Sequence, residues 1–157
     1  MIGNLTTNEI GDLLYKEVVG RIGCYANGRM YVVPVSYAYD GNDIYIHTYE
    51  GLKMKMMREN PNVCFEIDDF RDMGKWQSVI AWGQFEEIIS EEERKKALRL
   101  LINRSLPVIS SVTTHLGSNW PFSSDELEEI DGIVFRIKLH ERTGKFETSS
   151  DSPGING

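Results

Sequence analysis

The chain has 157 residues, of which 41% are hydrophobic and 26% are charged, and its formal net charge at pH 7 is −7. These values are typical of one globular domain, and the acidic balance argues against a general binder of nucleic acid or of anionic membranes. The chain begins without a basic and apolar leader, and Cys24 and Cys64 lie inside apolar runs as buried free thiols would. We therefore expect a cytoplasmic protein.

The first residues predict a helix followed by an antiparallel meander. Thr6 and Glu9 have the spacing of a capping box, and apolar residues follow at helical spacing. Asn27-Gly28, between two runs rich in strand-forming residues, is a strong hairpin signal, and a second tight turn follows at 40–43. These patterns predict one helix and then three strands, over 7–18, 21–26, 30–39 and 44–49.

The remaining residues predict further helices and three further strands. Asn60-Pro61 ends a short helix, Gly83 interrupts a long strand where a bulge or barrel corner is expected, and Ser90 with Glu93 opens another helix. The predicted helices cover 51–59 and 90–104, with one or two helical turns over 124–130. The predicted strands cover 63–68, 76–89 and 133–139, the last of them with a possible extension beyond 144.

Six strands in mostly antiparallel order predict a mainly β protein, a small closed barrel with peripheral helices. Closure would remove exposed sheet edges. We expect a single domain over 1–148 and a flexible C-terminal tail over 149–157. The segment 105–123, which contains His115, is long for a loop of a compact domain, and such loops are often functional.

The clearest chemical signal lies in residues 45–53. A predicted strand ends in His47 and Thr48, turns at Gly51 and leads into a helix that carries Lys53. Free N–H groups and the positive end of the helix dipole can bind a phosphate at a helix start, and the lysine adds a full charge. An ordinary strand-to-helix connection with a surface lysine is the alternative interpretation.

Several other kinds of site lack their usual sequence pattern. The three histidines are far apart and the two cysteines do not form a Cys-x-x-Cys pair, so no metal site is expected. The chain has no glycine-rich dinucleotide fingerprint, no P-loop and no serine-nucleophile elbow. The sequence therefore indicates no covalent nucleophile.

Four motifs occur in a characteristic order along the chain. They are the run 31–37 (YVVPVSY), the group His47-Thr48 with Gly51 and Lys53, the run 60–66 (NPNVCFE) and the run 76–87 (WQSVIAWGQFEE). Together they resemble the pyridoxamine 5′-phosphate oxidase-like family, most closely its nitroimidazole-resistance reductase branch, over residues 1–147. The resemblance implies an FMN-binding split barrel that forms a homodimer, with FMN in the clefts between the subunits.

The resemblance also implies which residues contact FMN. In chain order they are Val33, Pro34, Val35, Ser36, His47, Thr48, Gly51, Lys53, Trp76 and Ser78. The first four would follow the isoalloxazine and ribityl edge, and Lys53 would bind the phosphate. Ser78 stands where the oxidases proper have a glutamine that reaches FMN, and Trp76 would touch the flavin from the other subunit.

The chain departs from the oxidases proper at two places. Leu52 replaces the arginine that they pair with the equivalent of Lys53, so the phosphate charge would rest on Lys53 with Lys55 or Arg58. The oxidases' substrate-phosphate motif is matched poorly around residues 139–142. Oxidation of vitamin B6 is therefore not expected.

These observations predict an FMN-dependent oxidoreductase that passes electrons to small flat acceptors such as nitroaromatics or quinones. No catalytic residue is assigned, and His47 and His115 are the candidates for a proton donor. One alternative is a flavin carrier or sensor without turnover. Another is a relative of the same fold that binds heme or a deazaflavin, with His115 as the candidate axial ligand of the heme.

Overall fold

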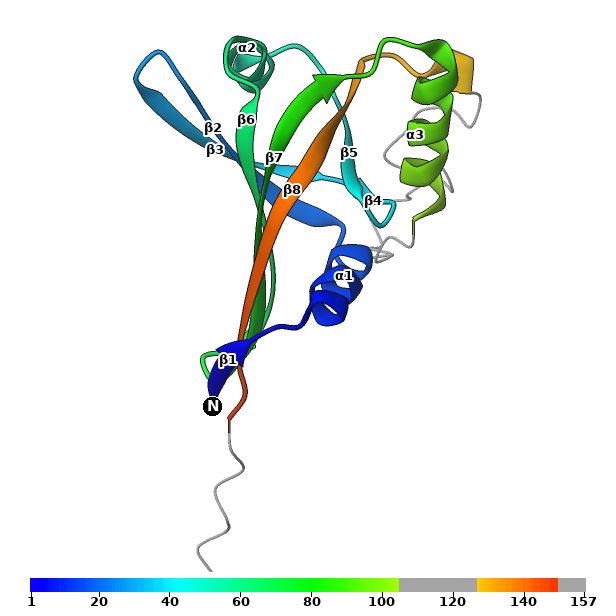
Figure 1. Ribbon diagram of the computed structural model, residues 1–157. Helices are drawn as coiled ribbons and strands as arrows, with labels where there is room; N and C mark the ends of the chain where they lie inside the picture. Colours follow the sequence, from blue (N-terminus) through cyan, green and yellow to red (C-terminus); the bar gives the residue numbers. More distant parts are fainter. Residues whose placement is uncertain (105–126, 150–157) are drawn as a thin grey trace, which may run out of the picture.

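Eight strands form one antiparallel sheet in the computed structural model of this protein, which describes residues 1–104 and 127–149 (Figure 1). The strands are β1 (Ile2–Asn4), β2 (Val19–Ala26), β3 (Arg29–Ser36), β4 (Ala38–Tyr39), β5 (Asp43–Thr48), β6 (Asn62–Asp72), β7 (Lys75–Glu87) and β8 (Ile133–Glu147). The helices are α1 (Thr7–Lys16), α2 (Leu52–Glu59), α3 (Glu91–Asn103) and the 3₁₀-helix η1 (Leu127–Glu129). The predicted mainly β class with peripheral helices is confirmed.

The sheet is open rather than closed. Its strands follow the order β3-β2-β6-β7-β8-β5-β4, and β1 pairs with the end of β8. The expectation of a closed barrel is therefore wrong, whereas the split form that the resemblance implies agrees with this order. The predicted meander over 21–49 is also wrong in part, because β5 pairs with β4 and β8 and not with β3.

Tyr37 explains both corrections. It divides the predicted strand over 30–39 into β3 and β4, and these two strands stand at opposite ends of the sheet order. Its backbone N–H donates to Val18 O at 2.9 Å, its hydroxyl donates to Leu14 O at 2.7 Å, and its side chain is 0% exposed. The strand ends here because this tyrosine turns into the core beside α1.

The predicted turns and bulge are confirmed. Asn27 and Gly28 have φ values of 52° and 77°, as a two-residue hairpin between β2 and β3 requires. The register between β7 and β8 shifts at Gly83, opposite Leu139. A Cβ atom at Gly83 would lie 2.4 Å from Lys138 O, so only glycine fits at this close approach.

The predicted helix starts are confirmed as well. Thr6 Oγ1 accepts from Glu9 N at 3.2 Å, and Glu9 Oε1 accepts from Thr6 N at 2.9 Å, which completes the capping box of α1. Ser90 Oγ accepts from Glu93 N at 3.5 Å at the start of α3. Helix α1 ends at Lys16, two residues earlier than predicted, because the chain is already extended at Glu17.

Some elements differ in length from the prediction. The pattern missed β1, whose three residues pair with the end of β8. Strand β6 extends to Asp72, beyond its predicted end, and β8 extends to Glu147, which confirms the possible extension beyond 144. The predicted loop 105–123 and nearly all of the predicted tail lie outside the described residues.

Two apolar clusters hold the sheet and the helices together. The larger one joins the sheet to α1 and α2 and includes Leu14, Phe65 and Met57. The smaller one lies under α3 and includes Leu98 and Leu101. No helix in the described parts of the chain is both long and apolar enough to cross a membrane.

Candidate functional site

Strand β3 offers an open backbone edge. Along the described chain it pairs with β2 on one side and stands at the end of the sheet order. Val35 is buried and Val33 packs against the core, whereas Pro34 and Ser36 are exposed on the other face. An edge strand presents N–H and C=O groups that no neighbouring strand uses. A flat ligand with polar edges can therefore bind along 33–36.

The end of β5 leads into α2 over three residues, as the sequence predicts. His47 and Thr48 end the strand, and Gly51 is the residue before the first helical turn. No side chain caps this helix start, and a Cβ atom at Gly51 would meet nothing within 4 Å. The first N–H groups of α2 therefore face open space, where an anion can bind.

Lys53 lies in the first turn of α2 and is half-buried. Burial lowers the pKa of Lys53, and the opposing electrostatic influence comes from Cys24 of β2. None of the ion pairs within the described residues includes Lys53. Its charge is available to a ligand.

Arg58 is not available in the same way. Its guanidinium contacts Glu50 at 2.6 Å and Glu87 at 3.3 Å, so both edges already face carboxylates. Lys55 is exposed on α2. The contribution of Arg58 to the phosphate charge stays a prediction, and Arg58 would have to exchange its partners from β7 and the turn before α2 for the phosphate.

His47 is held by the chain segment before β8. Its Nε2 atom donates to the carbonyl oxygen of Asp131 at 2.5 Å, and its ring packs edge-on against Tyr49 with centroids 5.4 Å apart. Burial lowers the pKa of His47, which favours the neutral ring at neutral pH. Gly132 has a φ of 97°, and a Cβ atom there would lie 2.6 Å from Thr48 O. The histidine therefore fixes how this segment crosses the end of β5.

Trp76 and Ser78 lie apart from the other predicted site residues. Both are on β7 next to its turn with β6, where Trp76 Nε1 donates to Glu147 Oε2 at 2.9 Å. This turn is at the bottom of Figure 1 beside β1, whereas α2 is at the top. One protomer therefore does not bring Trp76 and Ser78 to Lys53.

His115 and a possible metal site also need to be considered. His115, the candidate proton donor and heme ligand, lies outside the described residues. Among the residues that the structure describes, no group of three or more His, Cys, Asp or Glu side chains is placed to hold a metal ion.

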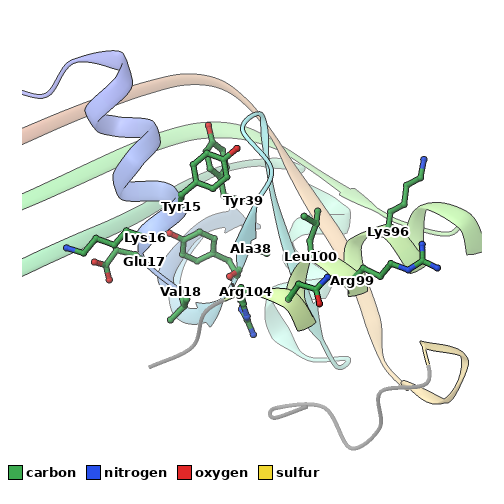
Figure 2. Close-up of a pocket in the computed structure, with 12 residues that line it drawn as sticks. Tyr15, Lys16, Glu17, Val18, Ala38, Tyr39, Lys96, Arg99, Leu100 and Arg104 are labelled. Atoms are coloured by element: carbon green, nitrogen blue, oxygen red, sulfur yellow. Dashed lines mark hydrogen bonds between the residues drawn. The ribbon is translucent and has the colours of Figure 1, made fainter. Parts of the chain in front are cut away.

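A cavity of about 770 Å³ lies between the end of α1, β4 and the second half of α3 (Figure 2). Sequence reasoning missed this site. Tyr37 and Tyr39 line it from the segment directly after β3, and Arg99 and Arg104 line it from α3 and its end. No single stretch of sequence signals it, because its walls come from three segments far apart in the chain.

Arg104 is the unusual charge of this cavity. Its Nη1 atom donates to Tyr37 O at 2.7 Å, and its buried Nε atom finds no hydrogen-bond partner within residues 1–104 and 127–149. Burial lowers the pKa of Arg104 to about 10, so the guanidinium is still charged at neutral pH. Burial also raises the pKa of Tyr37 and of Tyr39, which keeps both phenols neutral.

Known proteins share this architecture. The family model of pyridoxamine 5′-phosphate oxidase matches residues 6–146. A crystal structure of a FAD-binding protein from Mesorhizobium loti is 26% identical with a TM-score of 0.73, and the match covers 94% of this chain and 99% of that one. A candidate 5-nitroimidazole antibiotic resistance protein from Bacteroides thetaiotaomicron shares the fold, with 20% identity, a TM-score of 0.70 and coverage of 93% and 87%.

A relative of uncharacterized function comes from Rhizobium meliloti. It is 34% identical over 70 residues, which are 45% of this chain and 46% of that protein, so the match spans less than half the length of this relative. The family match, in contrast, includes all four motifs and nearly every described element. This chain therefore belongs to the pyridoxamine 5′-phosphate oxidase family.

Proposed function

We propose that this protein binds FMN and acts as an oxidoreductase that reduces small flat acceptors such as nitroaromatics or quinones. The observation that carries the proposal is the start of α2, where uncapped N–H groups and the unpaired charge of Lys53 occur together. The Mesorhizobium loti protein, which is named as FAD-binding, supports a flavin in this architecture. The choice of FMN over FAD follows the resemblance.

The residues present fit a flavin. The open edge of β3 suits the polar edge of the ring, and the half-buried Val33 offers apolar contact beside it. The space in front of Gly51 and the side chain of Lys53 suit a phosphate. The strand edge and the helix start therefore differ chemically, which suits a molecule with a flat ring at one end and an anion at the other.

Bound FMN would supply the electron transfer, and the protein supplies position and access. Backbone groups of β3 would orient the ring, and Lys53 would hold the phosphate. His47 would act on the site only by holding Asp131, because its Nε2 hydrogen is already donated to that carbonyl. We therefore assign it an orienting role in place of proton donation.

A homodimer is part of this proposal. The sheet face opposite the core exposes several large apolar side chains, which a second copy of the chain would bury. They include Tyr25 at 47%, Met30 at 81%, Val32 at 66% and Ile80 at 41% exposure. Trp76, Ser78 and Ile80 are every second residue along β7, so their side chains lie on this same face. A second copy packed here would bring its own Trp76 and Ser78 toward a flavin that the first copy alone leaves partly uncovered.

The cytoplasm is the proposed location. Cys24 and Cys64 are both free although they lie on neighbouring strands, with Cys64 opposite Gly23 in the β2–β6 register. Free thiols suit a reducing compartment.

The visible absorption spectrum of the purified protein, before and after heat release of its ligand, tests the cofactor. We expect the released flavin to be identified as FMN by chromatography. We also expect a reductant to reduce the bound flavin and a nitroaromatic or quinone to reoxidise it. Bound FMN without turnover for any donor and acceptor would favour a carrier or sensor. A heme spectrum, or a colourless protein that rejects added FMN, would overturn the proposal.

A further inference from the structure

We propose that the cavity between α1, β4 and α3 binds the acceptor, and that the acceptor is an aromatic molecule carrying an acidic group that Arg104 recognises. This inference rests on the proposed function, because it names the class of molecule that the flavin would reduce. It concerns a different part of the chain from the phosphate site at Lys53. The two can therefore be tested separately.

The first support is the uncompensated charge of Arg104. The side chain is partly buried, its Nη1 atom donates to the carbonyl oxygen of Tyr37, and its Nε atom has no hydrogen-bond partner among the described residues. Burial and Tyr37 are the influences on its pKa, and no carboxylate is among them. A partly buried cation without an anion is costly, and a bound carboxylate or phosphate would compensate it.

Two other arginines of this protein have carboxylate partners. The guanidinium of Arg136 contacts Glu86 at 2.6 Å and Glu93 at 3.5 Å, and Arg58 likewise has two carboxylate partners. An acidic chain has many carboxylates to offer, yet none of the described ones pairs with Arg104. Arg94 and Arg142 also donate to carbonyl or hydroxyl oxygens in place of carboxylates, but among the described residues only Arg104 has a buried side-chain nitrogen without a hydrogen-bond partner.

The second support is the composition of the cavity walls. Tyr15, which is 59% exposed, contributes aromatic surface, and Lys96 and Arg99 add positive charge along α3 (Figure 2). Glu17 is the one carboxylate among the described lining residues, and burial raises its pKa. A positive cavity in a protein of net charge −7 concentrates small anions locally.

The third support is the place and size of the cavity. Tyr37 follows Ser36 directly, so the cavity opens at the end of the strand that is proposed to carry the flavin ring. Its volume of about 770 Å³ lies within the roughly 300–1,000 Å³ that is usual for small-molecule sites. A ring held against Tyr15 with its acid on Arg104 would lie near the end of that strand.

The test compares two acceptors that differ only in charge, 4-nitrobenzoate and 4-nitrobenzamide. With the native FMN-loaded protein we expect kcat/KM to be roughly tenfold to a hundredfold higher for the benzoate, the range for one charged hydrogen bond. In Arg104→Gln we expect this preference to disappear while reduction of the amide continues. Arg29→Gln, a change at an exposed arginine of the β2–β3 hairpin, should keep the preference.

Calorimetric binding of 4-nitrobenzoate separates this inference from the proposed function. Arg104-dependent binding without reduction of either probe would overturn the oxidoreductase proposal and keep the anion site. Equal binding and turnover of the two probes by the native protein would overturn the anion site and keep the oxidoreductase. Should Arg104→Gln fail to fold, Arg104→Lys keeps the charge, and a complete loss of preference in a folded Lys variant with full FMN content shows that the guanidinium itself is required.

Discussion

The start of α2 and the cavity beside α3 are alike in one respect and differ in another. Each holds a partly buried cation, Lys53 or Arg104, that no carboxylate of the described chain neutralises. The first site is built from the single stretch 47–53, whereas the second needs the ends of two helices and β4. The comparison teaches that a site with a partly buried cation can be predicted from the sequence when one short stretch forms it. Such a site is missed when distant segments form its walls.

The largest effect is expected from the residue that creates the cavity wall. Tyr37→Ala should lower the free energy of unfolding by about 3–5 kcal/mol, because it removes a fully buried aromatic ring. Tyr37→Phe is the matched control and should cost about 1 kcal/mol, since it removes only the hydrogen bond to Leu14 O. Chemical denaturation measures both. Equal, small losses would show that Tyr37 does not hold the β3–β4 break in place.

The next effect concerns the local site. Lys53→Ala should weaken FMN binding by about 1.5–3 kcal/mol, because a charged partner of the phosphate is lost. Lys55→Ala, two residues further on the exposed side of α2, is the control and should change affinity little. Fluorescence titration of the ligand-free protein measures the difference. Equal losses in the two variants would contradict the phosphate assignment.

A smaller effect tests the helix beside the cavity. Thr6→Ala should cost about 1 kcal/mol of unfolding free energy, because it removes the side-chain acceptor of the α1 capping box. Thr7→Ala changes the neighbouring threonine, which makes no cap hydrogen bond in α1, and should cost less. Thermal unfolding of the two variants compares them. A cost of Thr7→Ala as large as that of Thr6→Ala would contradict the role of the capping box.

The smallest effect is a pH dependence at His47. Burial lowers the pKa of His47 below its ordinary value of 6.5, so below that pH the unfolded chain binds more protons than the folded one. The stability that the neutral ring contributes is therefore present above pH 6.5 and declines as the pH falls toward the folded-state pKa. In His47→Gln this part of the decline should vanish, whereas His140→Gln, a change at an exposed histidine, should keep it. Denaturant melts across this pH range give the comparison.

Much of the fold follows from signals that lie within a few residues of one another. The capping box at Thr6, the turn at Asn27-Gly28 and the bulge at Gly83 each depend on local backbone conformation or close approach, and each is present. The strand-to-helix connection before Lys53 is present for the same reason.

The errors come from contacts between distant segments. The run 30–39 is rich in strand-forming residues, and it breaks at Tyr37 because α1 and Val18 receive that side chain and its backbone. Arg58 already has a carboxylate partner because β7 brings Glu87 to it. No periodic pattern in the sequence indicates either contact.

The central claim is a flavin site that two copies of the chain complete, and sedimentation velocity tests it most directly when protein and flavin absorbance are followed together. The account predicts that FMN absorbance sediments with a dimer, with one flavin per subunit. It also predicts that a charge placed on the exposed apolar face, as in Val32→Glu, releases both the partner and the flavin. A stable monomer that carries FMN with native affinity would contradict the shared site.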